Sequence, residues 1–251
     1  ATPFARNAIF SGLFPKQLSE IYPDLYQLGR DEEQSLNRYE HQLLERQLRE
    51  KGLGSGIESR YMKIFDVAEG RNLVRRVGSF RTVPLVALVF NFLDMLAHGR
   101  SESEILQEIT PDVAAFRALT TAWFSHSSLL EVLRRIAQTD AVVIITSDHG
   151  SLLCTHATLV YGNRETSTNL RYKYGRNLRC DPKHALLMTS PEDYHLPSIG
   201  LGGNFIIAKG EYYFVYPTHF HEYQRQYRDS FQHGGISLEE IILPVAIMRP
   251  K

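Results

Sequence analysis

Cysteine is scarce in this sequence, with only Cys154 and Cys180 among 251 residues. Two such cysteines make neither a disulfide framework nor a Cys-x-x-Cys metal motif, which fits a reducing compartment. Long apolar runs are also lacking, because the longest, over residues 83–93, is far shorter than the roughly 20 residues that span a bilayer. The sequence does not open on a basic segment followed by an apolar one, as a secretory signal does. We therefore expect a cytoplasmic protein that is not inserted in a membrane.

An excess of charge is lacking too, because 28 lysines and arginines balance 28 aspartates and glutamates. Any attraction for a polyanion must therefore come from a local cluster of charge. Apolar residues make up 43% of the chain, which is ordinary for a globular protein and is enough for a sizeable core. A chain of this length forms one large domain or two small ones, and we expect a single domain over residues 1–251.

Strand and helix patterns alternate along the first part of the chain. The apolar runs at 83–93 and 141–146 are typical of strands buried on both faces, and residues 61–67 form a shorter strand candidate. Leucines at helical spacing predict a helix over residues 31–51, and residues 113–139 have a similar pattern. This alternation predicts an α/β fold of three layers, α/β/α, with a mostly parallel central sheet.

The pattern changes beyond residue 148, where glycine and polar residues separate short β-rich segments. Residues 204–208 and 211–216 flank the turn at Lys209-Gly210 and predict a hairpin. Residues 241–248 are expected to form the last strand. At the other end of the chain, residues 2–13 are typical of a loop that enters a helix, with Pro3 in the first turn.

Carboxylates and imidazoles follow the two apolar runs. Asp94 and His98 come after the first run, and Asp148 and His149 come after the second. His233 precedes the last predicted strand. Ligands of open α/β sheets bind beyond the carboxyl ends of the strands, and these side chains are ones that zinc or manganese takes. Each motif alone is weak, because helix starts and turns also favour aspartate, but together they predict a site for two metal ions.

This ordered set of motifs resembles the alkaline phosphatase superfamily and, more specifically, its PglZ domain. The matching segments are TPFARNAIFSGLFP, NFLDMLAHG, SDHG, NLRYKYGRNL and QHGGISLEEIILP. The nearest resemblance is to the effector domain of PorX-type response regulators, which act in two-component systems and type IX secretion. The resemblance implies an alkaline-phosphatase-like catalytic domain from the C-terminal part of a larger regulator that has an upstream receiver domain.

The resemblance also implies two zinc ions, with manganese as an alternative, and a threonine nucleophile at Thr2. It assigns one ion to Asp94, His98 and His233, and the other to Asp148, His149 and Thr2. The superfamily pattern has one further aspartate, at the end of a strand that precedes the nucleophile. We therefore expect that the first strand of the sheet is missing from this chain.

A threonine hydroxyl is a poor nucleophile at neutral pH unless a metal lowers its pKa. At the start of a helix, Thr2 would also have backbone N–H donors for an anion nearby, although threonine is a common N-cap without any metal. Arg6 or Asn7 could reach a non-bridging phosphoryl oxygen, and a solvated helix charge is the other interpretation of Arg6. Threonine cannot be converted to formylglycine, which argues against a sulfatase, whereas a mutase stays open on chemical grounds.

Basic residues interleaved with tyrosines are concentrated between positions 164 and 183. That alternation suits a single-stranded nucleic acid, whose phosphates need cations and whose bases need rings, while a solvated hairpin face is the other interpretation. The residues expected to contact substrate are Arg171, Lys173, Tyr174 and Arg176.

The sequence thus favours a zinc-dependent phosphodiesterase that cleaves a nucleotide-type phosphodiester, for example an oligonucleotide. A phosphomonoesterase is one alternative, and a domain that binds a nucleotide or a partner without turnover is another. The expected partners are the nucleotide or oligonucleotide substrate, the upstream receiver domain and, in a homodimer, a second copy of the chain. A membrane is not among them.

Overall fold

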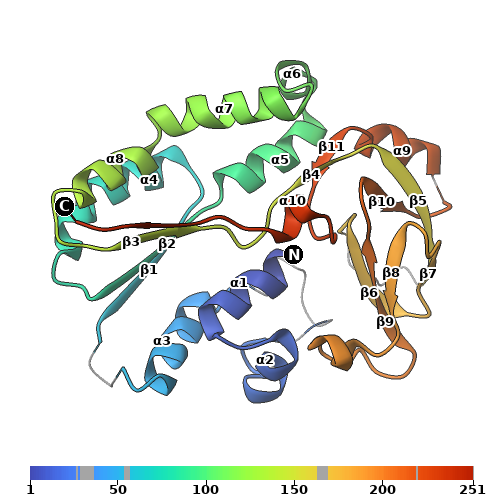
Figure 1. Cartoon of the computed structure of the whole chain (residues 1–251), viewed down its shortest axis with the longest axis horizontal. Helices are drawn as coiled ribbons and strands as arrows, with labels where there is room; N and C mark the ends of the chain where they lie inside the picture. Colours follow the sequence, from blue (N-terminus) through green and yellow to red (C-terminus); the bar gives the residue numbers. More distant parts are fainter. Residues whose placement is uncertain (27, 29–36, 54–56, 163–168, 219, 251) are drawn as a thin grey trace. The chain divides into compact units, whose positions relative to one another are not determined.

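The computed structural model describes residues 1–26, 28, 37–53, 57–162, 169–218 and 220–250. The chain divides into two compact units, and each unit is built from two separate stretches of sequence (Figure 1). Unit 1 comprises Ala1–Glu50 and Ser147–Leu243, and unit 2 comprises Lys51–Thr146 and Pro244–Lys251. None of the helices within the described residues is long and apolar enough to cross a membrane.

Unit 1 begins with three helices, α1 (Thr2–Ser11), α2 (Pro15–Ile21) and α3 (Glu40–Glu50). Helix α1 ends at Gly12, whose φ of 69° is in the left-handed region that glycine adopts without strain. The predicted helix at 31–51 is confirmed from residue 40 onward, and its residues 31–36 lie outside the described part of the chain. The three helices pack around a small core of Leu18, Leu25, Tyr26 and Leu43.

The second stretch of unit 1 is rich in short strands. They are β4 (Leu152–Cys154), β5 (His156–Tyr161), β6 (Tyr172–Arg176), β7 (Arg179–Cys180), β8 (Ala185–Met188), β9 (Gly203–Ala208), β10 (Tyr212–Val215) and β11 (Ser230–Gln232). Their sheet orders are β6-β9-β8, β10-β5-β7 and β11-β4. Helices α9 (Phe220–Tyr227) and α10 (Leu238–Ile241) follow near the end of the stretch, after the 3-10 turn Pro191–Tyr194. A core cluster lies between these sheets and includes Val160, Leu178, Ile206 and Phe214.

Unit 2 contains the parallel pair β1 (Ser59–Ile64) and β2 (Leu85–Phe90) and the antiparallel pair β3 (Val143–Thr146) and β12 (Val245–Met248). Its helices are α4 (Val67–Arg76), α5 (Phe92–Glu102), α6 (Glu104–Ile109), α7 (Val113–His126) and α8 (Ser128–Ile136), and a 3-10 turn at Val77–Phe80 follows α4. In Figure 1, α4, α7 and α8 lie along one side of these strands. The core of the unit joins β1, α4 and α8 through Ile64, Leu73, Val74 and Val132.

The mixed α/β class is confirmed, but the single, mostly parallel sheet is not seen in the described residues. Their strands form five sheets of two or three strands, and only the pairs β1–β2 and β5–β10 are parallel. Strands β9 and β10 exist where the sequence predicted them, yet each pairs with other strands instead of forming a hairpin. The last strand starts at Val245, because residues 238–241 are helical.

The expectation that residues 83–93 and 141–146 are buried on both faces is wrong. Every residue of β2 is half-buried, and Ile144 of β3 is 64% exposed. Within the described residues β3 pairs only with β12, so these apolar side chains have few neighbours to cover them. An apolar run identifies a strand, but it does not say how many layers cover that strand.

Candidate metal centre

Thr2 lies at the start of α1, where its hydroxyl meets a residue far away in the sequence. Thr2 Oγ1 is 2.8 Å from His149 Nε2, across 147 positions of sequence. The N-cap of the helix is Ala1, which has no capping side chain, so the interpretation of Thr2 as a simple N-cap is wrong. The start of α1 offers fewer donors to an anion than expected. Pro3 has no N–H, and those of Phe4 and Ala5 donate to the Ala1 carbonyl at 2.9 and 3.0 Å.

The orientation of the His149 ring is fixed by its own loop. His149 Nδ1 lies 3.1 Å from the carbonyl oxygen of Gly150. A carbonyl only accepts hydrogen bonds, so in the neutral imidazole Nδ1 carries the proton. His149 Nε2 therefore directs a lone pair toward Thr2, which is how a histidine is held when it accepts a hydroxyl proton or binds a metal.

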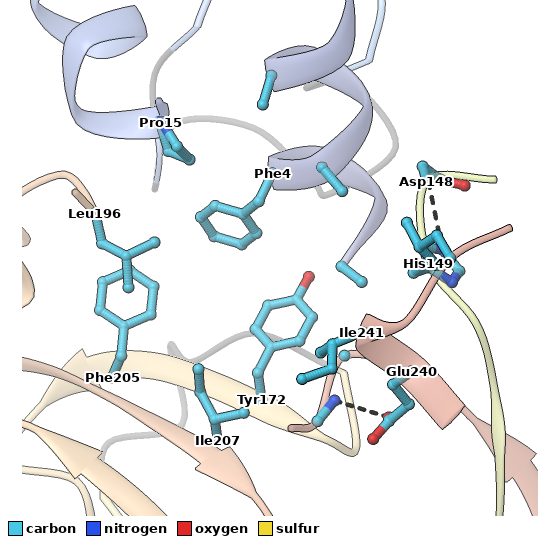
Figure 2. Close-up of a pocket in the computed structure, with 16 residues that line it drawn as sticks. Phe4, Pro15, Asp148, His149, Tyr172, Leu196, Phe205, Ile207, Glu240 and Ile241 are labelled. Atoms are coloured by element: carbon cyan, nitrogen blue, oxygen red, sulfur yellow. Dashed lines mark hydrogen bonds and ion pairs between the residues drawn. The ribbon is translucent and has the colours of Figure 1, made fainter. Parts of the chain in front are cut away.

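Asp148 completes this cluster and lies at one edge of a pocket in unit 1 (Figure 2). Its Oδ2 is 3.5 Å from His149 Nε2, and the two side chains are only 19% and 12% exposed. Oδ2 is buried and accepts no hydrogen bond from any described residue. A buried carboxylate oxygen beside an unprotonated nitrogen is unfavourable, and a cation between them would relieve that cost. The hydroxyl, carboxylate and imidazole present are donors that zinc accepts, so the residues fit a metal.

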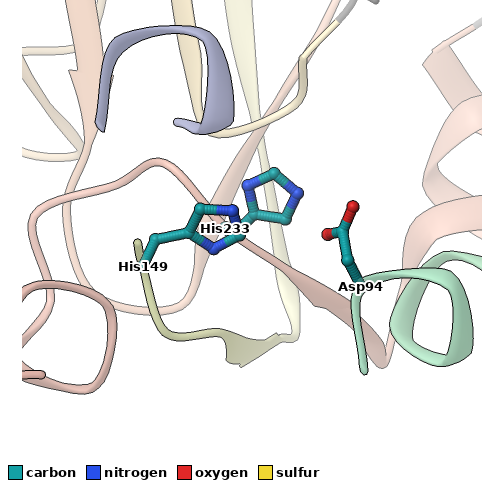
Figure 3. A group of neighbouring side chains, drawn as sticks. All are labelled: Asp94, His149 and His233. Atoms are coloured by element: carbon teal, nitrogen blue, oxygen red, sulfur yellow. The ribbon is translucent and has the colours of Figure 1, made fainter. Parts of the chain in front are cut away.

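His233 lies directly beside His149. The two rings stack with centroids 4.0 Å apart and an angle of 16° between their planes (Figure 3). His233 is 6% exposed and follows β11, whose pairing with β4 places Gln232 opposite Leu152. The next residue is Gly234, with a φ of 103°. A Cβ there would lie 2.5 Å from the ring of Tyr172, so only glycine lets this loop approach β6.

Unit 2 carries the other acid–histidine pair on one face of α5. Asp94 Oδ1 and His98 Nε2 are 3.4 Å apart, four residues along the helix. The hydrogen bond that the His98 imidazole donates to the Asp94 carboxylate raises the pKa of His98. Asp94 follows β2 in the first turn of α5, as predicted. Figure 3 also draws Asp94, whose carboxylate, like the imidazoles of His149 and His233, is a donor that zinc accepts.

Arg6 and Asn7 are engaged inside unit 1. Arg6 Nε donates to Glu40 Oε1 at 2.6 Å, and the Arg6 side chain is only 13% exposed. The interpretation of Arg6 as a solvated helix charge is therefore wrong. Asn7 is fully buried and donates to the carbonyl of Pro3 at 2.7 Å. These bonds hold α1 and its link to α3, and neither geometry supports the expected contact with a phosphoryl oxygen.

The basic and aromatic segment at β6 is a buried strand, which corrects the expected nucleic-acid surface. Arg171 is fully buried and pairs with Glu240, with Nε–Oε1 and Nη2–Oε2 distances of 3.0 and 2.5 Å. Lys173 is 3% exposed and donates to the carbonyl of Asn169. Tyr174 is packed in a core cluster with Phe205. Only Arg176, at the end of β6, is exposed. The sequence could not show that Arg171 and Lys173 are buried, because the groups that neutralise a buried charge can come from distant segments of the chain.

Glu240 is the residue that the sequence interpretation missed. Besides Arg171, it accepts hydrogen bonds from the backbone of Gly235 at 2.8 Å and from the hydroxyl of Ser237 at 2.7 Å. It thus fixes the loop that follows His233. The spacing Ser237-Leu-Glu-Glu240 is a capping box, and that pattern of residues is the signal by which Glu240 could have been found.

The chain matches a known protein family. Residues 1–248 match the family described as the BREX system PglZ alkaline phosphatase-like domain. A comparison with curated proteins found no match. The family match spans Thr2, both acid–histidine pairs and His233, and it confirms the resemblance to PglZ domains, while the nearer resemblance to PorX-type regulators stays a prediction. The chain therefore belongs to the PglZ family of alkaline phosphatase-like domains.

Proposed function

We propose that this domain is a metal-dependent phosphohydrolase that cleaves a phosphodiester, with Thr2 as its nucleophile. The observation that carries the proposal is the convergence of Thr2 Oγ1 and Asp148 Oδ2 on His149 Nε2, at 2.8 and 3.5 Å. The hydroxyl oxygen, the carboxylate oxygen and the imidazole nitrogen are close together in a half-buried site, and these are the donor atoms that surround a bound cation. Membership of an alkaline phosphatase-like family supports the same chemistry.

Two ions are part of this proposal, with zinc as the first choice and manganese as the second. Asp148, His149 and Thr2 are proposed to hold one ion, and Asp94, His98 and His233 are proposed to hold the other. Both imidazoles are donors that zinc accepts, and paired metals in such enzymes lie about 3.5–4 Å apart. Bound metal lowers the pKa of a hydroxyl and neutralises phosphoryl charge.

The side chains of the site have defined parts in the proposed reaction. The Thr2 hydroxyl loses its proton to solvent, and its oxygen, positioned by α1, attacks phosphorus while the bond from phosphorus to the leaving alcohol breaks. Water then hydrolyses the phosphothreonine and releases the monoester. His149 holds its Nε2 lone pair toward Thr2 because the Gly150 carbonyl fixes the other ring nitrogen. Glu240 keeps the His233 loop in place through Gly235 and Ser237.

The test compares metal content and hydrolysis for the wild type, Thr2→Val and Thr2→Ser. Bound zinc is measured by elemental analysis, and the substrates are bis(p-nitrophenyl) phosphate, p-nitrophenyl phosphate and p-nitrophenyl sulfate. We expect zinc in all three proteins and a preference of the wild type for the diester. Thr2→Val should lose at least about 10³-fold in kcat, whereas Thr2→Ser should keep a measurable rate.

The same data decide between the alternatives. Bound zinc without cleavage of any ester would refute the enzyme and favour a domain that binds a nucleotide or partner. A preference for the monoester would make the protein a phosphomonoesterase. The ligand assignment fails if an Asp94→Ala, His233→Ala double variant keeps full zinc occupancy.

The finer identity of the substrate is proposed from the motifs alone. The PorX-like segments favour a nucleotide-type diester and a role as the effector of a response regulator with a receiver domain. Cleavage of a short oligonucleotide at a rate at least equal to that of the aryl diester would support this assignment. Cleavage of the aryl ester without any cleavage of oligonucleotides would remove it.

A further inference from the structure

We infer that unit 1 carries a pocket for an uncharged aromatic group attached to the phosphorus of the substrate, and that this pocket selects such esters over alkyl esters. The inference rests on the proposed function and names the substrate class of that site. The pocket has a volume of about 390 Å³, which is within the range of small-molecule sites and suits a group the size of one ring system.

The pocket is connected to the proposed chemistry by its lining. Asp148 and His149 form one edge of it, and Phe4 of α1 forms another (Figure 2). The Thr2 hydroxyl lies 2.8 Å from Nε2 of His149, and His149 lines the pocket. A phosphoryl group within reach of the Thr2 hydroxyl therefore has its ester substituent next to this space.

The walls of the pocket are aromatic and aliphatic. Phe4 meets Tyr172 edge-to-face, with centroids 5.5 Å apart and an angle of 83°, and it meets Phe205 at 6.0 Å and 72°. Leu196 and Ile207 complete the side of the pocket away from Asp148. Rings already arranged edge-to-face leave edges and faces for a further ring, and such aromatic pairs add about 0.5–1.5 kcal/mol beyond their buried area.

The charge of the pocket excludes an anionic group. Among the described residues that line it, the charged side chains are the carboxylates of Asp148 and Glu240, and none is a lysine or arginine. Glu240 is already paired with Arg171. On the side of the pocket away from Asp148 and His149, a phosphate or carboxylate would be desolvated without a cation, which is costly, whereas an uncharged ring does not have this cost.

The test uses phenylphosphonate and methylphosphonate as probes, because each carries one organic group on phosphorus. Affinity for the zinc-loaded wild type is measured by calorimetry, and we expect phenylphosphonate to bind at least about tenfold more tightly. Ala8→Leu adds three carbons to a pocket-lining position of α1 at only a small cost in helix propensity. It should bring the affinity ratio close to one and leave methylphosphonate binding unchanged.

The matched control is Ala114→Leu, at an exposed position of α7, which should keep the wild-type ratio. If Ala8→Leu does not fold, Leu196→Trp fills the pocket from the opposite wall. The inference is overturned if the wild type shows no preference for the phenyl group, or if both pocket variants keep that preference. A clear preference in a protein that hydrolyses no ester would refute the proposed reaction while supporting the pocket.

Discussion

Glu240 shows how a single buried charge can organise a loop. Its side chain is only 1% exposed. Burial is the largest influence on its ionisation and opposes it, but the hydrogen bonds and charge of Arg171, with donors from Ser237 and Gly235, outweigh burial. The pKa of Glu240 therefore lies below its ordinary value. The carboxylate stays charged in the folded protein, and the loop after His233 depends on that charge.

Glu240→Gln should lower the free energy of unfolding by roughly 3–5 kcal/mol at pH 7, because Arg171 is left buried without its counter-ion. A carboxyl whose pKa is lowered by folding stabilises the protein above its unfolded pKa of about 4.3, and that contribution is lost as the pH falls through the folded pKa. The difference between wild type and variant should therefore shrink below pH 4, as measured by urea unfolding at several pH values.

The control for this prediction is Glu239→Gln, at the exposed neighbouring position of α10. We expect it to change the unfolding free energy by less than about 0.5 kcal/mol. An equal loss of stability for Glu240→Gln at pH 7 and pH 3.5 would show that its charge has no part in holding the loop.

For single residues, the sequence predicted which side chains could act in the site better than it predicted whether they are buried or exposed. Thr2 and His149 were identified because their motifs are local, and the structure brings them within 2.8 Å. Arg171 was assigned to a surface because its partner, Glu240, is 69 positions away. The type of a side chain shows what it can bind. Long-range packing decides whether that side chain contacts solvent or a buried counter-ion.

Among the elements, the short helix α10 packs unusually closely against the segment after His149. Gly150 donates its backbone N–H to the carbonyl of Glu240 at 3.0 Å. A Cβ at Gly150 would lie 1.9 Å from the carbonyl oxygen of Glu239. The Glu239 carbonyl belongs to the backbone and cannot rotate away as a flexible side chain could. Position 150 therefore requires glycine.

Gly150→Ala should therefore destabilise unit 1 by roughly 1–3 kcal/mol, the usual cost of overpacking. The measurement is the thermal midpoint, with Gly78→Ala as the control, because a Cβ at Gly78 would meet nothing within 4 Å. Equal midpoints for the two variants would mean that α10 does not lie against Gly150 as described.

The elements themselves were largely predictable, and their pairing was not. Strands β2, β3 and β9 lie inside the ranges that the apolar runs and β-rich segments indicated, or within one residue of them. The pairing of β12 with β3 joins residues about a hundred positions apart in the sequence. Local periodicity carries no information about contacts over that distance. The break that separates α7 from α8 was also missed, because Ser127 caps α8 in the middle of a continuous helical pattern.

At the scale of the whole molecule, the β3–β12 pair exposes an unusual amount of apolar surface. Ile144 is 64% exposed, its cross-strand partner Ile247 is 56% exposed, and Val245, two residues from Ile247 and on the same face, is 64% exposed. Soluble proteins seldom leave apolar strand residues together in water, because such strands associate with other chains.

Ile247→Lys should therefore reduce self-association of the protein. In sedimentation velocity, the protein concentration at which associated species first appear should be about tenfold higher for the variant than for the wild type. Val67→Lys is the control, since Val67 is 69% exposed at the start of α4 and is not part of the β3–β12 pair. If both substitutions change association equally, net charge and not the β3–β12 surface is responsible.

The family could be identified from the sequence because its motifs are spread along the chain, and the match over residues 1–248 agrees. The division into two units could not be predicted, since each unit combines stretches that are distant in sequence. Composition and periodicity describe one stretch at a time, whereas a unit made of two stretches is defined by the contacts between them.

That division has a consequence for the order in which the protein is made. On the ribosome, residues 51–146 emerge before the second stretch of unit 1 begins, so β1 and β2 can pair while Thr2 still lacks its partner. The contact of Thr2 with His149 must wait for 147 further positions, and His233 appears later still. In a nascent chain, therefore, the contact between Thr2 and His149 forms only after most of unit 1 has been released.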